Sequence, residues 1–324
     1  MIGEQMSVPL TGLEAQFPAV SIGSNGTTLS FVHAWPSTFN IGDYLSSPRH
    51  YFDFECYPAS ESGFSRVLIL GGGAFNDIGA YASSLVEADQ KIAWGIGRSV
   101  PSPEDFGKSG PSIPANFSAF GSRDRALVAA NRPLVPCASV MGDIVDIPRG
   151  DALGFFLNQN PAVSGESLVD IFSTIDSEAV VGTNSLSETE FRAKFALTAK
   201  IVTNSYHVAY WGLLSGRQVA LIGYSSKFAS ILDLFELPDS VVQYQRGDGV
   251  RLLGAIERAL RSDSFSRLAS PMETKRAFRQ ANVDYAQHLV TTGLFRQIEA
   301  LDESSIRRKK REIEVWRAYS LTRR

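Results

Sequence analysis

The sequence predicts an α/β protein built from two doubly wound domains that face each other across a cleft. Short apolar runs alternate with helical patterns in both halves of the chain, and several runs end directly in glycine or polar corners. Alternating strands and helices form parallel sheets, which display ligand-binding groups at the carboxyl ends of their strands. At 324 residues, the chain is long enough for two such domains.

Composition narrows the class of protein. The hydrophobic fraction of 44% and the charged fraction of 20% are typical of a soluble globular protein. A net charge of −3 gives no basic field, so nucleic acid is not a predicted partner. The sequence has neither a membrane-length apolar run nor a signal-peptide pattern, which predicts a cytoplasmic protein. Cys56 and Cys137 lie far apart without metal-ligand spacing, which favours buried thiols over a disulfide.

The first half begins with a predicted strand at residues 28–33, and a polar corner that leads into a short helix follows it. A buried strand at 66–70 runs directly into three glycines and a helix to residue 86. Further strands are expected at 91–97 and 117–122, before a helix at 123–130 and a buried segment at 134–140. The sequence turns polar between 142 and 150, which divides the chain into a first domain, 1–148, and a second, 149–295.

The second half repeats the alternation. Strands are expected at 152–158, 179–182, 201–205 and 218–222, and helices at 166–173, 187–199, 209–214, 250–268 and 274–301. Ser187 is a suitable N-cap for the second of these helices. Residues 296–324 form a predicted helical tail rich in arginine and lysine. That tail fits a solvated helix end or contact with an anionic membrane surface or polymer.

The most informative stretch spans residues 201–228. His207 stands where a parallel strand gives way to a helix, which would lower its pKa slightly and present a ring nitrogen to the cleft. Lys227 follows the next strand at the same edge and is either a surface lysine or a contact for phosphate or carboxylate. Arg123 and Asp124 form either an ion pair within the domain or an arginine facing the cleft.

The glycine corner at 71–73 permits close approach of a ligand to the backbone. A dinucleotide fingerprint would need a further glycine where Asn76 stands, so a standard nicotinamide site is not predicted. Tight packing of a strand against a helix explains the three glycines equally well. Neither a GxSxG elbow, an HExxH motif, a P-loop nor a carboxylate cluster is present, and no metal is predicted.

Taken in order, these corners resemble the polysaccharide pyruvyl transferase family, in particular members that make acidic exopolysaccharides of the succinoglycan type. Each matching piece is short, and the pieces span residues 38–230. The matching pieces are Asn40-Ile41-Gly42-Asp43, Val67 to Gly73, Trp94-Gly95-Ile96-Gly97, Ser122-Arg123-Asp124, Pro136-Cys137, and Thr203-Asn204-Ser205-Tyr206-His207 with Lys227. One departure stands out: many members carry arginine two residues before the histidine, where this chain has Ser205.

The resemblance implies two Rossmann-like domains in a GT-B-like arrangement, with the acceptor side in the first and the donor side in the second. It implies transfer of pyruvate from phosphoenolpyruvate, a substrate rather than a cofactor, to two hydroxyls of a sugar to form a cyclic ketal. The acceptor would be a sugar or lipid-linked oligosaccharide, made at the inner face of the cell membrane. The basic tail would then contact the membrane peripherally.

Roles for individual residues follow from this chemistry. His207 is the expected general acid, Asp43 the residue that accepts a proton from the sugar hydroxyl, and Arg123 the third catalytic group, an anion contact. The remaining predicted substrate-binding residues are Asn40, Gly71, Gly72, Gly73, Arg98, Asp124, Asn204, Ser205, Tyr206 and Lys227. Because a serine cannot replace an arginine's charge, Arg123, Arg98 or Lys227 would have to compensate for Ser205.

Two alternatives stay open. A glycosyltransferase of the same architecture would use a nucleotide sugar and would need an acidic residue for the ribose hydroxyls near the end of a strand in the second domain. Glu236 is the residue closest to such a position. A non-catalytic carbohydrate-binding relative would have lost its donor site, as the serine at position 205 suggests.

Overall fold

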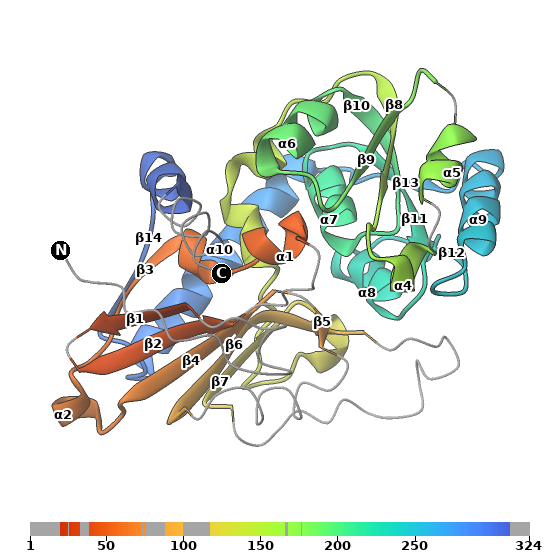
Figure 1. The fold of residues 1–324 in the computed structure, drawn as a ribbon. Coiled ribbons are helices and arrows are strands. Elements are labelled where there is room, and N and C mark those ends of the chain that lie inside the picture. Colours follow the sequence, from red (N-terminus) through yellow and green to blue (C-terminus); the bar gives the residue numbers. More distant parts are fainter. Residues whose placement is uncertain are drawn as a thin grey trace.

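The computed structural model describes residues 20–24, 26–32, 39–72, 74–75, 88–99, 117–165, 168–175 and 177–311. Two six-stranded, mostly parallel sheets confirm the predicted mixed α/β class and are consistent with a Rossmann-like fold (Figure 1). The three-part division at 148 and 295 stays a prediction. The predicted helix up to residue 86, Gly73 and residues 100–116 lie outside the described residues.

The first sheet has the order β1-β2-β4-β6-β5, and β7 also pairs with β6. β1 is antiparallel to β2, and the other pairings are parallel. The apolar run predicted as a buried strand is confirmed in β4, where Leu68, Ile69 and Leu70 are fully buried. The strands are β1 (Val20–Ser24), β2 (Thr27–Val32), β4 (Arg66–Gly71), β5 (Ala74–Phe75), β6 (Gln90–Arg98) and β7 (Ala119–Ser122).

The second sheet has the order β12-β11-β10-β8-β9, and a short antiparallel strand, β13, pairs with β11. β10 therefore lies beside β8, although β9 comes between them in the chain. Such a reversal of strand order creates a switch point, and ligands of open α/β sheets bind beyond the carboxyl ends of the strands there. The strands are β8 (Ala152–Leu157), β9 (Val180–Thr183), β10 (Thr198–Thr203), β11 (Gln218–Gly223), β12 (Val242–Gln243) and β13 (Phe265–Ser266).

Helices cover both faces of the second sheet (Figure 1). Every residue of α7 is buried, because this apolar helix packs against the sheet on one side and against α1 and α10 on others. The predicted cap at Ser187 is confirmed as a capping box with Glu190. That helix ends at residue 196 rather than 199, because Thr198 already enters β10. The helices are α4 (Pro161–Ser164), α5 (Leu168–Ser173), α6 (Glu188–Ala196), α7 (Tyr206–Leu214), α8 (Lys227–Leu234) and α9 (Gly249–Arg261).

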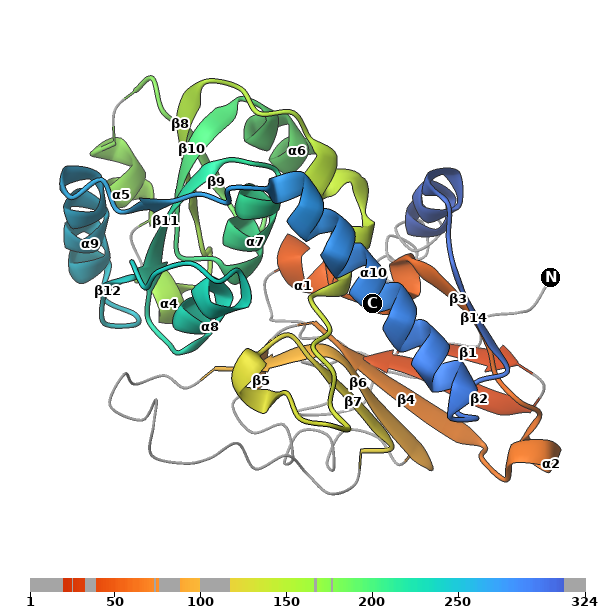
Figure 2. The same cartoon turned by 180° about the vertical axis from the view of Figure 1, so that it is seen from behind.

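The single helix predicted at 274–301 is wrong in its second part. α10 (Pro271–Thr291) ends beside Gly293, whose φ of 75° stops a helix, and the chain then forms β14 (Gln297–Ala300). β14 pairs with β3 (Phe52–Glu55), and α10 runs from the second sheet across the first (Figure 2). This part of the chain therefore packs with both sheets.

Two other predicted helices are shorter in the structure. The helix expected at 123–130 is one 3₁₀ turn, Arg125–Leu127, because the chain becomes extended again at Val128. The helix expected to reach residue 268 ends at Arg261, and Asp263 takes a positive φ of 47° before β13 begins. The other short elements are α1 (Ile41–Leu45), α2 (Ala59–Ser62) and the 3₁₀ turns Pro48–His50, Ala138–Met141 and Asp143–Asp146.

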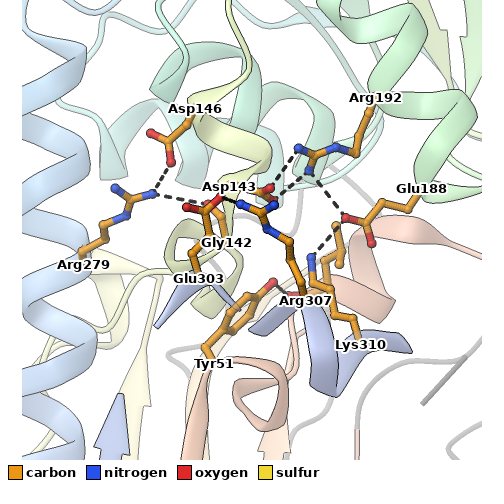
Figure 3. Close-up of polar contacts among 11 residues, drawn as sticks. Tyr51, Gly142, Asp143, Asp146, Glu188, Arg192, Arg279, Glu303, Arg307 and Lys310 are labelled. Atoms are coloured by element: carbon orange, nitrogen blue, oxygen red, sulfur yellow. Dashed lines mark hydrogen bonds and ion pairs between the residues drawn. The ribbon is translucent and has the colours of Figure 1, made fainter. Parts of the chain in front are cut away.

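Ion pairs flank the connecting segment, residues 123–151, which joins β7 of the first sheet to β8 of the second (Figure 3). Arg192 of α6 holds Asp143 through two hydrogen bonds of 2.8 and 3.0 Å, and it also pairs with Glu188. Lys310, in a helix that covers residues 303–311, donates to the same Glu188 at 3.1 Å. On the other side, Arg279 of α10 binds Asp146 at 2.6 Å. The connecting segment is thus tied to α6 on one side and to α10 on the other.

The predicted basic tail is only partly a free basic surface. Lys309 binds Asp53, Lys310 binds Glu188 and Arg307 pairs with Glu303. A helix covers residues 303–311, and 312–324 lie outside the described residues. Within the part of the chain that is described, no helix is long and apolar enough to cross a membrane.

Candidate functional site

Residues that follow strands of the first sheet meet residues that follow strands of the second. Arg123, directly after β7, places its guanidinium carbon 4.0 Å from the centre of the Tyr206 ring, at the start of α7. Ser99, after β6, donates a 3.0 Å hydrogen bond to Ser225, after β11. The carboxyl edges of the two sheets therefore face each other, the arrangement in which parallel α/β sheets hold ligands.

The helix α1 brings Asp43 to His207. Oδ1 of Asp43 lies 4.0 Å from Nδ1 of His207, close enough for electrostatic coupling but too long for a hydrogen bond. Gly42 makes this approach possible, because a Cβ there would lie 2.3 Å from His207 Nδ1. Asn40 caps the helix by accepting from the amides of Gly42 and Asp43.

His207 is buried, with 5% of its surface exposed, rather than open to solvent at the edge of a cleft. Within the described ranges, its Nε2 has no hydrogen-bond partner. Burial, together with the positive charges of Arg123 and Lys227, lowers the histidine's pKa well below its usual value. The ring is therefore neutral at pH 7, and one nitrogen is available to a ligand.

Asp43 and Lys227 have pKa values displaced towards each other. Burial raises the pKa of Asp43 to about 7, although the charges of Lys227 and Arg123 oppose this shift. Burial lowers the pKa of Lys227 to about 7, against the attraction of Asp43. Lys227 Nζ donates a 2.6 Å hydrogen bond to the Tyr224 hydroxyl. Both groups can therefore exchange a proton near neutral pH.

Arg123 is a buried cation, 3% exposed, and its Nη1 has no hydrogen-bond partner among the residues that the structure describes. Gly97 leaves room for its side chain, since a Cβ there would lie 2.8 Å from Arg123 Nε. The neighbouring Asp124 accepts from the Ser230 hydroxyl at 2.7 Å and from the Arg98 amide at 3.3 Å. Asp124 thus links the first sheet to α8, while Arg123 keeps donor capacity for an anion.

Of the predicted site residues, Asp43 lies beside His207 and Arg123 beside Tyr206, and the charges of Arg123 and Lys227 act on both Asp43 and His207. The side chain of Asn204 is instead used within the second sheet: it accepts from the Asn158 amide at 2.7 Å and donates to Ser164 and Tyr244. Ser205 is the buried residue before α7.

Gly71 and Gly72 pack against the segment after α1. A Cβ at these positions would lie 2.7 Å from Pro48 Cδ and 1.5 Å from Ser46 Oγ. The alternative of tight packing at this corner is therefore realised, although it involves a turn rather than a helix. Gly73 is outside the described residues.

Sequence reasoning missed Tyr224 and the part that Gly42 plays. Tyr224 follows β11 directly and stands three residues before Lys227, so its place at a strand end was the available signal. Gly42 belongs to the Asn40–Asp43 corner, but no pattern shows which side chain a glycine must admit. Within the described ranges, no group of three or more His, Cys, Asp or Glu residues is placed to hold a metal ion.

Comparison with known proteins adds no relative to this picture. Neither the models of protein families nor the curated proteins contain a match to this chain.

Proposed function

We propose that the protein is a polysaccharide pyruvyl transferase with a GT-B-like arrangement, which moves pyruvate from phosphoenolpyruvate onto two hydroxyls of a sugar. The observation that carries this proposal is the buried Arg123, whose Nη1 finds no partner in the described part of the chain and whose charge acts on Asp43 and His207. Phosphoenolpyruvate carries a phosphate and a carboxylate, and a guanidinium and an amine are suitable contacts for them. The acid and base that ketal formation needs lie in the same cluster.

The electrostatics favour an exchange of the two roles expected from the sequence. Asp43, with a pKa of about 7, carries a proton in a sizeable fraction of molecules at neutral pH, whereas His207 is neutral. Asp43 is then the better donor to the methylene carbon of phosphoenolpyruvate. His207 accepts the proton of the attacking sugar hydroxyl through its free Nε2.

The reaction balances with these groups. Protonation of the methylene makes C2 electrophilic, one sugar hydroxyl adds there, and its proton passes to the base. Loss of phosphate gives a second cation-like carbon, which the second hydroxyl attacks to close the ketal. Hydrogen phosphate leaves with the remaining proton, and Arg123 and Lys227 offset the negative charge of the donor throughout.

Arg123 can also supply the positive charge that Ser205 lacks. The guanidinium lies over the ring of Tyr206, the residue next to Ser205, although it comes from the first sheet. The positive charge that many members place two residues before the histidine is thus supplied here across the interface. The departure from the family pattern is compatible with an anionic donor.

The nucleotide-sugar alternative is less well supported. Glu236, the acidic residue considered for ribose, lies beyond the end of α8 and accepts a 2.6 Å hydrogen bond from Arg125. It is therefore engaged in an ion pair between the sheets. A sugar or lipid-linked acceptor, work at the inner face of the cytoplasmic membrane and contact through the tail are parts of the proposal that rest on the family resemblance alone.

Ligand-dependent unfolding tests the proposal directly. At 100 times its dissociation constant, a ligand that binds only the folded state stabilises it by about 2.7 kcal/mol. We expect phosphoenolpyruvate to raise the melting temperature, UDP to leave it unchanged, and Arg123→Gln to abolish the shift. Stabilisation by UDP alone would establish the glycosyltransferase reading, and stabilisation by neither ligand would favour a non-catalytic relative.

A further inference from the structure

The fold holds Arg123 along most of its length. Its backbone amide donates a 3.1 Å hydrogen bond to the carbonyl of Ile96 in β6. Its stem lies against Gly97, where a Cβ would come within 3.1 Å of Arg123 Cγ. At the far end, the guanidinium carbon lies 4.0 Å from the centre of the Tyr206 ring. The side chain is therefore fixed at both ends, and the donor that finds no partner within the described ranges, Nη1, is at its tip.

The ring of Tyr206 is itself held in place by a stack of aromatic rings. It lies within 16° of parallel to the ring of Tyr210, which lies within 9° of parallel to the ring of Phe278 in α10. Tyr206 is buried, and burial raises the pKa of its phenol above the usual range, which keeps the ring neutral. A neutral aromatic face attracts a guanidinium more strongly where water is excluded. Tyr206 is thus a rigid support for the cation above it.

We infer that Tyr206, which the sequence predicts as a substrate-binding residue, is instead a positioning residue that holds the Arg123 guanidinium for an oxyanion of the substrate. The ring covers a face of the guanidinium, whereas hydrogen bonds to a carboxylate or phosphate form in its plane, so the two contacts do not compete. A side chain that is fixed beforehand also loses less entropy when the anion binds. The inference rests on the proposed function for the identity of the anion, phosphoenolpyruvate, but not for the anion site itself.

This role belongs to the ring of Tyr206 and not to its hydroxyl group. A tyrosine that bound the substrate directly or gave it a proton would need the hydroxyl, and phenylalanine could not replace it. A tyrosine that supports Arg123 needs only an aromatic face, which phenylalanine has and leucine lacks. A tyrosine that merely fills the core would be replaced about equally well by either residue. The three roles therefore predict different effects of the same substitutions.

Binding of anions to the full chain tests this inference. Isothermal titration calorimetry measures the dissociation constants of phosphoenolpyruvate and of inorganic phosphate, a probe that does not presuppose the donor. We expect Tyr206→Leu to raise both constants by about tenfold, through loss of a desolvated cation–π contact, and Tyr206→Phe to restore them. In ketal formation the same change should appear in the KM for phosphoenolpyruvate rather than in kcat. Phe278→Leu removes the ring at the other end of the stack and should leave both constants unchanged.

Fluorination of the ring keeps the test decisive even if Tyr206→Leu fails to fold. Phenylalanines with increasing numbers of ring fluorines at position 206 keep the shape of the ring but withdraw charge from its face, so anion binding should weaken with each fluorine. Binding that is unchanged across this series, lost in Tyr206→Phe, equally weakened in Phe278→Leu, or absent from the parent protein would overturn the inference. Fluorine-dependent phosphate binding without ketal synthesis would support it and count against pyruvyl transfer. Ketal synthesis with an unchanged KM across the series would count against the role of Tyr206 alone.

Discussion

The contact between Gly42 and His207 offers a sharp test of the site. In Gly42→Ala, the new methyl carbon would lie 2.3, 2.5 and 2.6 Å from Nδ1, Cγ and Cβ of His207. These atoms form the base of the ring rather than a flexible end, and the ring packs beside Tyr206 and Trp211 within a fully buried helix. Either α1 or the histidine must therefore move.

The expected change in the unfolding free energy of Gly42→Ala follows from overpacking. Insertion of a methyl group into a packed core costs about 1–3 kcal/mol, and the gain of alanine over glycine in a helix, up to about 1 kcal/mol, offsets part of it. We expect Gly42→Ala to lower the unfolding free energy in urea by about 1–2 kcal/mol with an unchanged slope. Ketal formation should fall at least tenfold, because Asp43 moves with α1.

Gly254→Ala in α9 is the matched control. The nearest atom to its new methyl group would be Arg258 Nη1, at 3.5 Å, so this variant should be as stable as the parent protein or up to about 1 kcal/mol more stable. If Gly42→Ala were as stable and as active as the parent, the close approach of α1 to His207 would be wrong, and with it the assignment of the site.

Three further predictions concern charged groups. Because the pKa of Asp43 is raised in the folded protein to about 7, its contribution to stability is present below pH 4 and is lost as pH rises to 7; Asp43→Asn should therefore be more stable than the parent at pH 8, by about 4 kcal/mol, with the difference vanishing near pH 4 in urea titrations. Arg217 donates to four backbone carbonyls from a fully buried position, so Arg217→Met should cost about 3 kcal/mol in denaturant unfolding, whereas Arg251→Met, at an exposed site, should cost less than 1 kcal/mol; equal losses would refute the argument. Lys310→Met removes one cation from Glu188 of α6, whose other partner, Arg192, binds Asp143 of the connecting segment; limited proteolysis should cut this segment faster in the variant than in the parent, and an unchanged rate would show that the pair does not help to hold it.

Around the second sheet, the alternation of strands and helices could be predicted because each buried strand carries its own apolar run and its own corner. What the sequence could not show was the partner of α10. A helix with an apolar face packs on any sheet that leaves a face uncovered, and nothing in its periodicity names that sheet. Asn282 donates to the backbone of Pro136 and accepts from the indole of Trp94 in β6, and these contacts place the helix on the first sheet.

The candidate site likewise contains residues whose positions could be predicted from the sequence and residues whose roles could not. His207 and Lys227 were predictable because both follow parallel strands, and the topology of such sheets brings these positions to one edge. Asn40 and Asn204 occupy equally polar corners, yet their side chains satisfy backbone amides of the fold. The sequence does not distinguish an asparagine that caps a helix from one that binds a ligand, so only the structure separates the two cases.

Two buried arginines, Arg217 and Arg123, differ in how completely the fold satisfies their hydrogen-bond donors. Arg217 is fully buried and directs its guanidinium nitrogens to four backbone carbonyls and the hydroxyls of Thr198 and Ser215. Arg123 is almost as deeply buried, but among the residues described here its Nη1 has no hydrogen-bond partner, and neither has Nε2 of His207. An unsatisfied buried donor costs about 1–3 kcal/mol, and a fold that can fully satisfy Arg217 has no structural need of the second arrangement. Binding of an anion by Arg123 would supply the missing partner, and this is the strongest reason to place the function there.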